Sequence, residues 1–270
     1  MEMSVDILIK GLDFPEGPAF DSKGNLWFVE LKGGNLCQWA DGVLKRFPTD
    51  GEPNGVAIDG NDHIWFCDAG QNAIRTYCPD SDSFETVENQ IENRPLFRPN
   101  DLTFDVNGNL LFTCPGDSRT EPTGYVCALK MDGTVRKIAE SLYFPNGLAF
   151  APEGKTLIIA ETYMHRLWKG TWDVQGFRLG NFEPWMVVGG PTGPDGMAFD
   201  VEGNLYVAIF GKQCIKKISP LGEIVKEIPL SGKNPTNCAF QGTSLFVTEA
   251  EVGQIMRLAT PYLGLPLFSK

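Results

Sequence analysis

One phrase recurs six times along the chain, and this repeat limits the possible folds more than any other feature of the sequence. Each copy joins a short apolar run to a turn rich in Gly, Asn and Asp, as in "FPEGPAFDSKGNLWFVE" and "FPNGLAFAPEGKTLIIAE". The third residues of the copies stand at positions 16, 54, 100, 146, 195 and 236, so that neighbouring copies are 38 to 49 residues apart. Periods of this length are typical of propellers and solenoids.

The runs within each copy predict antiparallel strands. Apolar residues flank a turn, as in "AFDVEGNLYV", which is the signature of a β-hairpin. Further strand-like runs follow, for example "CIKKIS" and "EIVKEI" after the fifth copy. About four strands in about 45 residues, repeated around an axis, make the blade of a β-propeller. A two-sheet β-sandwich is the alternative, although its strands need not repeat at this period.

We therefore predict an all-β fold, a six-bladed β-propeller of four-stranded antiparallel blades, with residues 1–270 as a single domain. The last copy lacks an outer strand after "QIMRL", whereas "VDILI" precedes the first copy. Residues 5–9 are expected to complete the final blade, so that the N-terminal strand closes the ring and protects the sheet edges. Gly and Pro are spread evenly along the chain, which gives no sign of a domain boundary.

The charge of the chain limits its partners. A formal net charge of -11 argues against a nucleic acid or a membrane surface, because both reward basic patches, and it fits a metal ion. The N-terminus lacks a signal-peptide pattern, and no segment approaches the roughly 18 apolar residues that span a bilayer, so we expect a soluble cytoplasmic protein. The seven cysteines are scattered without a Cys-x-x-Cys pair, which predicts buried thiols in a reducing compartment.

The third residue of each copy varies within a framework of Pro before it and apolar residues after it. The first strand of every propeller blade lies nearest the axis, so these residues are expected to form a ring at one mouth of the channel. All six carry a side-chain oxygen: Glu16, Asn54, Asn100, Asn146, Asp195 and Thr236. Such oxygens, with two carboxylates, suit a hard divalent cation. Turn formation alone is the alternative, above all for Asn54 and Thr236.

The second strand of each blade returns to the same mouth. The residues expected there are Glu30, Asp68, Cys114, Glu161 and Glu249. We interpret most of them as hydrogen-bonding support for the ring. The turn "CPGDSRTEPTG" is the longest at this mouth and could cover a substrate. The chain has only His63 and His165, which leaves little for a serine triad or a histidine metal site, although His165 could reach the mouth.

The chain resembles the SMP-30, gluconolactonase and luciferin-regenerating-enzyme-like family of six-bladed propellers. The resemblance covers nearly the whole chain and rests on "FPEGPAFD", "RPNDLTFD", "FPNGLAF", "GPDGMAFD", "NPTNCAF" and the tail "LGLPLF". It implies that Glu16, Asn146 and Asp195 hold one divalent cation, Ca²⁺ foremost, with Mg²⁺, Mn²⁺ or Zn²⁺ as alternatives. It also implies that Arg98 and Asn100 contact the substrate. Residues two apart in an extended segment can face one cavity, but a surface salt bridge is the alternative for Arg98.

The resemblance implies hydrolysis of a small-molecule lactone, with a sugar (aldono)lactone as the expected substrate. The cation would polarise the carbonyl, and Asp195 would take a proton from the attacking water. Because a metal-bound carboxylate is a weakened base, hydroxide held by the metal is the alternative nucleophile. Two other classes stay open: a phosphotriesterase-like hydrolase at the same metal site, and a non-catalytic, metal-binding regulatory propeller.

Overall fold

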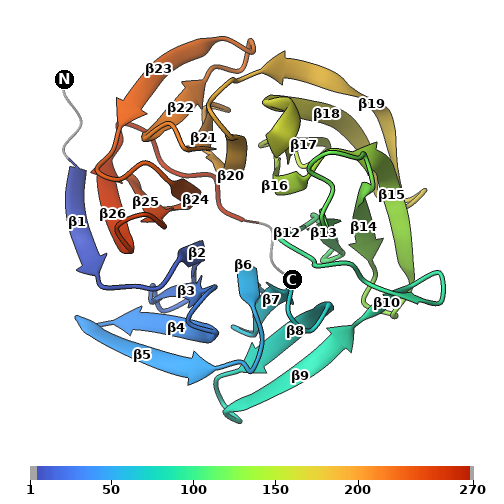
Figure 1. Cartoon of the computed structure of the whole chain (residues 1–270), viewed down its shortest axis with the longest axis horizontal. Coiled ribbons are helices and arrows are strands. Elements are labelled where there is room, and N and C mark those ends of the chain that lie inside the picture. Colours follow the sequence, from blue (N-terminus) through green and yellow to red (C-terminus); the bar gives the residue numbers. More distant parts are fainter. Residues whose placement is uncertain (1–4, 268–270) are drawn as a thin grey trace.

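The computed structural model describes residues 5–267, and these form six four-stranded antiparallel sheets around a central channel (Figure 1). The sheets are the blades of a β-propeller, so the predicted all-β, six-bladed fold is confirmed. In blades 1 to 5 the strands run from the channel outwards in sequence order. The ends of the predicted domain, including Phe268 of the "LGLPLF" tail, lie outside the described residues.

The strands of each blade fall into four concentric positions. The innermost strands of blades 1 to 6 are β2 (Pro15–Phe20), β6 (Pro53–Ile58), β12 (Leu102–Phe104), β16 (Pro145–Phe150), β20 (Gly193–Phe199) and β24 (Pro235–Gln241). The second strands are β3 (Leu26–Glu30), β7 (Ile64–Asp68), β13 (Leu110–Cys114), β17 (Thr156–Glu161), β21 (Leu205–Phe210) and β25 (Ser244–Glu249). The third strands are β4 (Asn35–Ala40), β8 (Ala73–Cys78), β14 (Gly124–Leu129), β18 (Arg166–Asp173), β22 (Cys214–Ile218) and β26 (Gln254–Ala259). The outermost strands are β5 (Val43–Pro48), β9 (Ser83–Glu88), β15 (Val135–Leu142), β19 (Arg178–Val187), β23 (Ile224–Pro229) and β1 (Val5–Lys10).

Three short elements lie between blades or strands. The strands β10 (Gln90–Ile91) and β11 (Arg94–Pro95) pair in a small ribbon between blades 2 and 3. A single turn of 3-10 helix, η1 (Thr162–Met164), follows β17.

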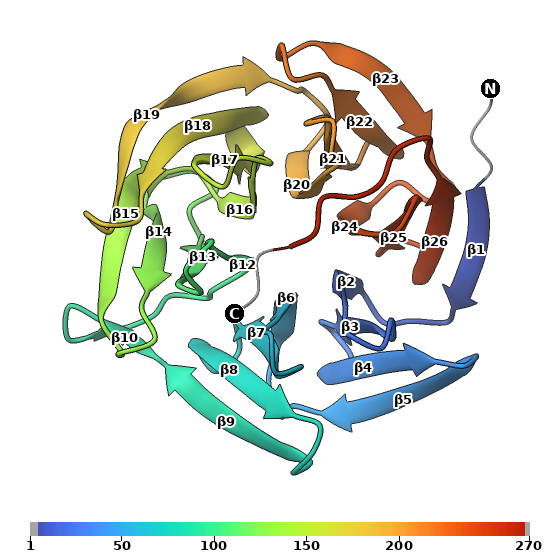
Figure 2. The same cartoon turned by 180° about the vertical axis from the view of Figure 1, so that it is seen from behind.

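Strand β1 closes the ring as the sequence predicted. It pairs antiparallel with β26, from Val5 opposite Leu258 to Lys10 opposite Gln254. Figure 2 shows β1 beside β26 at the edge of the ring. Blade 6 is therefore assembled from both ends of the described chain, and the hydrogen bonds between β1 and β26 hold these ends together.

The core lies between the blades. Six apolar clusters each join two neighbouring blades. In β3, Trp27 and Val29 pack towards blade 2, while Leu26 and Phe28 pack towards blade 6. Because the second strands are buried on both faces, their sequences are continuous apolar runs with little alternation.

The segment after β26 crosses the far end of the channel, as the dark red trace in Figure 2 shows. Val201 N donates to Leu263 O at 2.9 Å, and Leu265 N donates to Phe199 O at 2.9 Å. These hydrogen bonds fix the segment at the end formed by the hairpin turns, opposite the ring residues.

Two further expectations can be compared with the structure. All seven cysteines are free thiols, and six of them are buried, as their scattered spacing predicted. Within residues 5–267, no helix has the length and hydropathy needed to cross a membrane.

Candidate active site

β-Bulges displace the ring residues from regular strand pairing. In blade 1 the register of β2 against β3 shifts between Glu16 and Ala19. Equivalent shifts occur at the same place in blades 2, 4, 5 and 6. A bulge adds a residue to one strand and re-aims its side chains. The repeated framework therefore builds a similar bend in these five blades and leaves the chemistry to the residue at the bend.

Five of the six ring residues line a cavity of about 280 Å³: Glu16, Asn54, Asn100, Asn146 and Asp195. Arg98 also lines the cavity, so all the residues predicted to bind the cation or the substrate lie there. Thr236 is the exception, because it is buried and its hydroxyl donates to the carbonyl oxygen of Pro15 at 2.8 Å. Asn54, for which turn formation was an alternative, faces the cavity.

Phe14 and Phe210 line the cavity, to which no described residue of blade 6 contributes. These residues come from blades 1 and 5, which flank blade 6. Their rings are stacked with centroids 6.5 Å apart.

Glu16 and Asp195 are buried acids, 5% and 7% exposed. Burial is the main reason that the pKa of Glu16 lies well above its usual value, and the charges of Asp195 and Asp101 raise it further. Burial and the charge of Asp101 likewise raise the pKa of Asp195, although a hydrogen bond from Asn146 opposes them. Among the described residues, no basic side chain offsets this repulsion.

This set of donors fits a hard divalent cation. Buried carboxylates are normally paired with a base or bound to a metal, and amide oxygens complete oxygen-only sites. No group of three His, Cys, Asp or Glu side chains within residues 5–267 is arranged to hold a metal ion. A cation held by the carboxylates of Glu16 and Asp195 would therefore take an amide oxygen as its third ligand, and Asn146 stands beside them.

The orientation of the Asn146 amide is set by Thr162, the first residue of η1. The Thr162 hydroxyl donates to Pro194 O at 2.8 Å, so its oxygen accepts from Asn146 Nδ2 at 3.2 Å. An amide whose nitrogen is held in this way presents its oxygen on the other side. Thr162 thus makes the oxygen of Asn146 the atom available to a cation.

Asp101 is a third buried acid, which the sequence analysis missed. Burial raises its pKa to about 7, and it accepts hydrogen bonds from Leu102 N at 2.9 Å and Asn237 Nδ2 at 3.1 Å. The residue after the ring position is glycine in the other blades except blade 6, where it is Asn237. A Cβ at Gly55 would overlap Asp101 Oδ1. The replacement of this repeated glycine by Asp and Asn was a signal that could have identified the pair.

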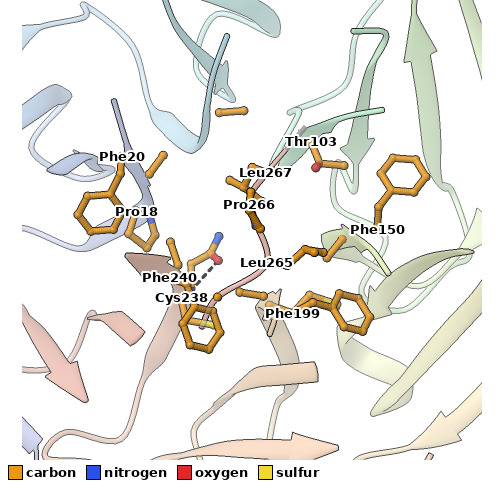
Figure 3. A pocket seen from close by; sticks show the side chains of 18 of the residues that line it. Pro18, Phe20, Thr103, Phe150, Phe199, Cys238, Phe240, Leu265, Pro266 and Leu267 are labelled. Atoms are coloured by element: carbon orange, nitrogen blue, oxygen red, sulfur yellow. Dashed lines mark hydrogen bonds between the residues drawn. The ribbon is translucent and has the colours of Figure 1, made fainter. Parts of the chain in front are cut away.

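Asp101 and Asn237 also line a second cavity of about 450 Å³ farther along the channel. One large apolar residue from each blade surrounds this cavity: Phe20, Ile58, Phe104, Phe150, Phe199 and Phe240. Figure 3 shows Leu265, Pro266 and Leu267 between the rings of Phe20 and Phe240 on one side and Phe150 and Phe199 on the other. The tail thus covers the far side of the channel, and the ring residues face the opposite mouth.

Arg98 combines the two roles that the sequence left open. Its Nη2 lies 2.5 Å from Glu52 Oε2 in a half-exposed salt bridge, and the residue also lines the cavity. The long loop expected to cover the site supplies Arg119, whose guanidinium lies 5.6 Å from the ring centroid of Phe144. Both arginines thus stand at the rim above the acids.

Three residues that precede the framework proline have left-handed backbones. They are Phe14 with φ 61°, Arg98 with φ 48° and Phe144 with φ 57°. This conformation costs about 1–2 kcal/mol for a residue with a Cβ, and such strain gathers at functional sites. All three side chains line the cavity.

Of the second-strand ends, Phe210 lines the cavity, but the five residues that the sequence placed near the mouth do not: Glu30, Asp68, Cys114, Glu161 and Glu249. Glu30 is held by Arg46, Asp68 by Arg75, and Glu161 by Arg166. His63 and His165 are also absent from the cavity wall. The buried carboxylates at these strand ends therefore anchor turns and the third or fourth strands of their blades around the site.

The fold and this cluster define a class, a six-bladed β-propeller with buried carboxylates and amides at one mouth of its channel. The chain belongs to the SMP-30/gluconolactonase/LRE-like family, whose model matches residues 14–251.

Two relatives and one solved structure illustrate the range of similar proteins. A diisopropyl-fluorophosphatase of Loligo vulgaris is 28% identical over 272 residues, covering 87% of this chain and 85% of the relative. A gluconolactonase of Zymomonas mobilis is 26% identical over 296 residues, covering 96% of this chain and 82% of the relative. The structure of regucalcin, a calcium-binding protein from Agrobacterium tumefaciens, has a TM-score of 0.86 at 20% identity, covering 100% of this chain and 97% of that chain. The last likeness is one of fold.

Proposed function

We propose that the protein hydrolyses lactones in the mouth cavity with the help of one divalent cation. The observation that carries this proposal is the pair of buried carboxylates, Glu16 and Asp195, which have no basic partner among the described residues and lie beside Asn146. The likeness to a gluconolactonase supports the reaction class. The regucalcin fold, described as calcium-binding, supports Ca²⁺ as the first candidate, with Mg²⁺, Mn²⁺ or Zn²⁺ as alternatives.

In this proposal Glu16, Asn146 and Asp195 hold the cation. When bound, the cation would polarise the lactone carbonyl and offset the charge that develops on its oxygen. Arg98 and Asn100 orient the substrate from blade 3. The Asp195 carboxylate accepts a proton from water as the water oxygen adds to the carbonyl carbon. The ring carbon–oxygen bond then breaks, the leaving oxygen takes up a proton, and the product is a hydroxy acid.

Glu16→Gln and Asp195→Asn test the proposal. Calorimetry measures cation binding, and a pH indicator follows acid release from a panel of lactones. We expect Glu16→Gln to lose both cation and activity. For Asp195→Asn, lost hydrolysis with the cation still bound supports the base role, whereas loss of both shows that it is needed as a ligand. Glu202→Gln, at an exposed turn at the far end, is the matched control and should behave as wild type.

A phosphotriesterase-like reaction is the second candidate, favoured by the likeness to the diisopropyl-fluorophosphatase. The same cation would polarise a P=O group as it does a C=O group. Turnover of fluorophosphates and lactones by the same preparation separates the two reactions. If the protein binds the cation but turns over neither class, a non-catalytic binding role replaces both.

Two kinds of lactone are candidates for the substrate. A sugar (aldono)lactone follows from the likeness to a gluconolactonase. A less polar lactone is favoured by the rings of Phe14, Phe144 and Phe210 at the cavity wall.

A further inference from the structure

The larger cavity, about 450 Å³, lies at the far end of the channel and takes no part in the proposed hydrolysis. Its volume is within the roughly 300–1,000 Å³ of pockets that bind small molecules. In five blades an alanine directly precedes the large apolar residue of the cavity wall, and these small side chains leave space inside the ring of large ones: Ala19, Ala57, Ala149, Ala198 and Ala239. Blade 3 has Thr103 at this place.

The tail of the described chain forms the outer wall of this cavity (Figure 3). Leu265 N donates to Phe199 O at 2.9 Å, which fixes the wall as far as Leu265. The two lining residues that follow, Pro266 and Leu267, are exposed. The cavity therefore borders solvent beside the end of the described chain, where a small molecule could enter.

The inner end of the cavity is acidic. Asp101 and Asn237 stand three positions before Phe104 and Phe240 along the chain, so they lie deeper in the channel than the phenyl rings. Each of the two polar residues is only 7% exposed. Asp101 is the only carboxylate among the described residues that line the cavity, and none of these residues is Lys, Arg or His.

The carboxylate of Asp101 has room for further hydrogen-bond donors. Its Oδ1 accepts from Leu102 N at 2.9 Å, and its Oδ2 accepts from Asn237 Nδ2 at 3.1 Å. An ionised carboxylate has about four acceptor sites, and a buried one is normally paired with a positive charge. Neither of these two donors is charged, so Asp101 lacks a positive partner among the described residues.

A divalent cation at the mouth would leave the charge of Asp101 unbalanced. Such a cation offsets the two negative charges of Glu16 and Asp195, whereas Asp101 lines the far cavity and not the mouth cavity. The charge of Asp101 nevertheless acts on both of the other acids. A single positive charge beside Asp101 would therefore complete the neutralisation of the three buried carboxylates.

The walls determine the rest of the ligand. Five phenylalanines from different blades surround the space: Phe20, Phe104, Phe150, Phe199 and Phe240. Phenyl rings attract cations and stack with other rings, and apolar surface buried between them adds affinity. An anion is opposed by Asp101 and by the net charge of -11.

We infer that the far cavity binds a small primary amine that carries an apolar, arylalkyl group. The ammonium group donates to Asp101 at the inner end, and the aryl group lies among the phenyl rings near the tail. This site is separate from the mouth cavity, and the inference does not depend on lactone hydrolysis.

Three probes test the inference by calorimetry. 2-Phenylethylamine has both features of the ligand, 2-phenylethanol replaces its ammonium group with a hydroxyl, and methylamine lacks the ring. The titrations are made at pH 8, above the pKa of about 7 of Asp101, and with an excess of Ca²⁺ that competes for the mouth acids. We expect 2-phenylethylamine to bind about tenfold more tightly than either of the others.

Two variants locate the bound amine. Asp101→Asn should weaken 2-phenylethylamine about tenfold and leave 2-phenylethanol within about threefold, which also shows that the cavity is intact. Thr103→Leu narrows the cavity and should weaken both ring-bearing probes about tenfold. Thr76→Leu is the matched control, since Thr76 is a partly buried threonine of β8 that does not line the cavity.

The outcomes are decisive for each part of the inference. Equal affinity for the amine and the alcohol, or amine affinity that Asp101→Asn leaves unchanged, overturns the ammonium site. Amine binding that Thr103→Leu leaves intact lies elsewhere and overturns the choice of cavity. If Asp101→Asn does not fold, the three probes on the wild type and on Thr103→Leu still decide the question. Lactone turnover by the same preparation tests the proposed function separately.

Discussion

Asn237 of blade 6 donates a hydrogen bond to Asp101 of blade 3, with Nδ2 and Oδ2 3.1 Å apart and 136 positions between the residues. The bond spans the channel between blades on opposite sides of the ring. It occurs where other blades carry glycine, next to the acids of the candidate site. Asp101 thus adds a third carboxylate to Glu16 and Asp195, and their burial leads to the first prediction.

The stability of the metal-free protein should fall as pH rises from about 5 to 8. Burial raises the pKa of Asp101 to about 7 and those of Glu16 and Asp195 well above their usual values. The folded state therefore binds protons more tightly than the unfolded state. The stabilisation that these protons give the folded state is complete below about pH 4, the pKa of the acids in the unfolded chain. It is lost as pH rises through the pKa of the folded state, and the free energy of unfolding then falls by at most about 1.4 kcal/mol per pH unit for each proton.

Urea unfolding in the presence of a chelator measures this dependence. Asp101→Asn should flatten the dependence of the unfolding free energy on pH near pH 7. For the wild type, replacing the chelator with an excess of the cation should also weaken this dependence. A metal-free protein whose stability rises between pH 5 and 8 would contradict the prediction.

Gly55→Ala should unfold or strongly destabilise the site. A Cβ at this position overlaps Oδ1 of Asp101, and overpacking of this kind costs about 1–3 kcal/mol or more. Gly180→Ala is the control, because the nearest atom to its added Cβ is Thr171 O at 3.8 Å. Thermal unfolding compares the two. Equal melting temperatures for both variants would show that Asp101 can move away without loss.

Thr162→Val should weaken cation binding about tenfold, whereas Thr162→Ser should stay within about threefold of wild type. Valine removes the hydroxyl that accepts from Asn146 Nδ2 and donates to Pro194 O. The amide of Asn146 is then free to turn its nitrogen towards the cation. Calorimetric titration measures the Ca²⁺ affinity of both variants and of the wild type. An unchanged affinity in the valine variant would show that Thr162 does not set the orientation of the Asn146 amide.

Phe144→Gly should be more stable than Phe144→Ala by about 1 kcal/mol, which reverses the usual order. Both variants lose the phenyl ring of Phe144, but only glycine adopts φ 57° without strain. At Phe182, which lies within β19 and outside the left-handed residues, alanine should be the more stable replacement. The same order at both positions, measured by chemical unfolding, would remove the argument for strain at Phe144.

The repeat predicted the blades, their closure by the N-terminal strand and the meeting of Glu16 with Asp195, because a fixed framework sets where each ring residue lies. Other features depend on contacts that no repeat encodes. Thr236 is buried outside the cavity, where its hydroxyl bonds to Pro15 O and to the hydroxyl of Thr248. A residue before proline prefers an extended backbone, so the left-handed backbones found there could not be predicted from local sequence. Asp101 could have been identified from the sequence, because it replaces a glycine that recurs after the ring residue in four other blades.

The closure of the ring also shapes how the protein is made. Asp6 of β1 and Arg257 of β26 form an ion pair across 251 positions of the chain. During translation β1 leaves the ribosome before the other described strands, and β26, with which it pairs, follows after all of them. Until then the nascent chain carries an unpaired strand and an open edge on the growing array of blades, and such edges invite association with other chains. The docking of β26 onto β1 is therefore a late step in folding, and it completes the ring.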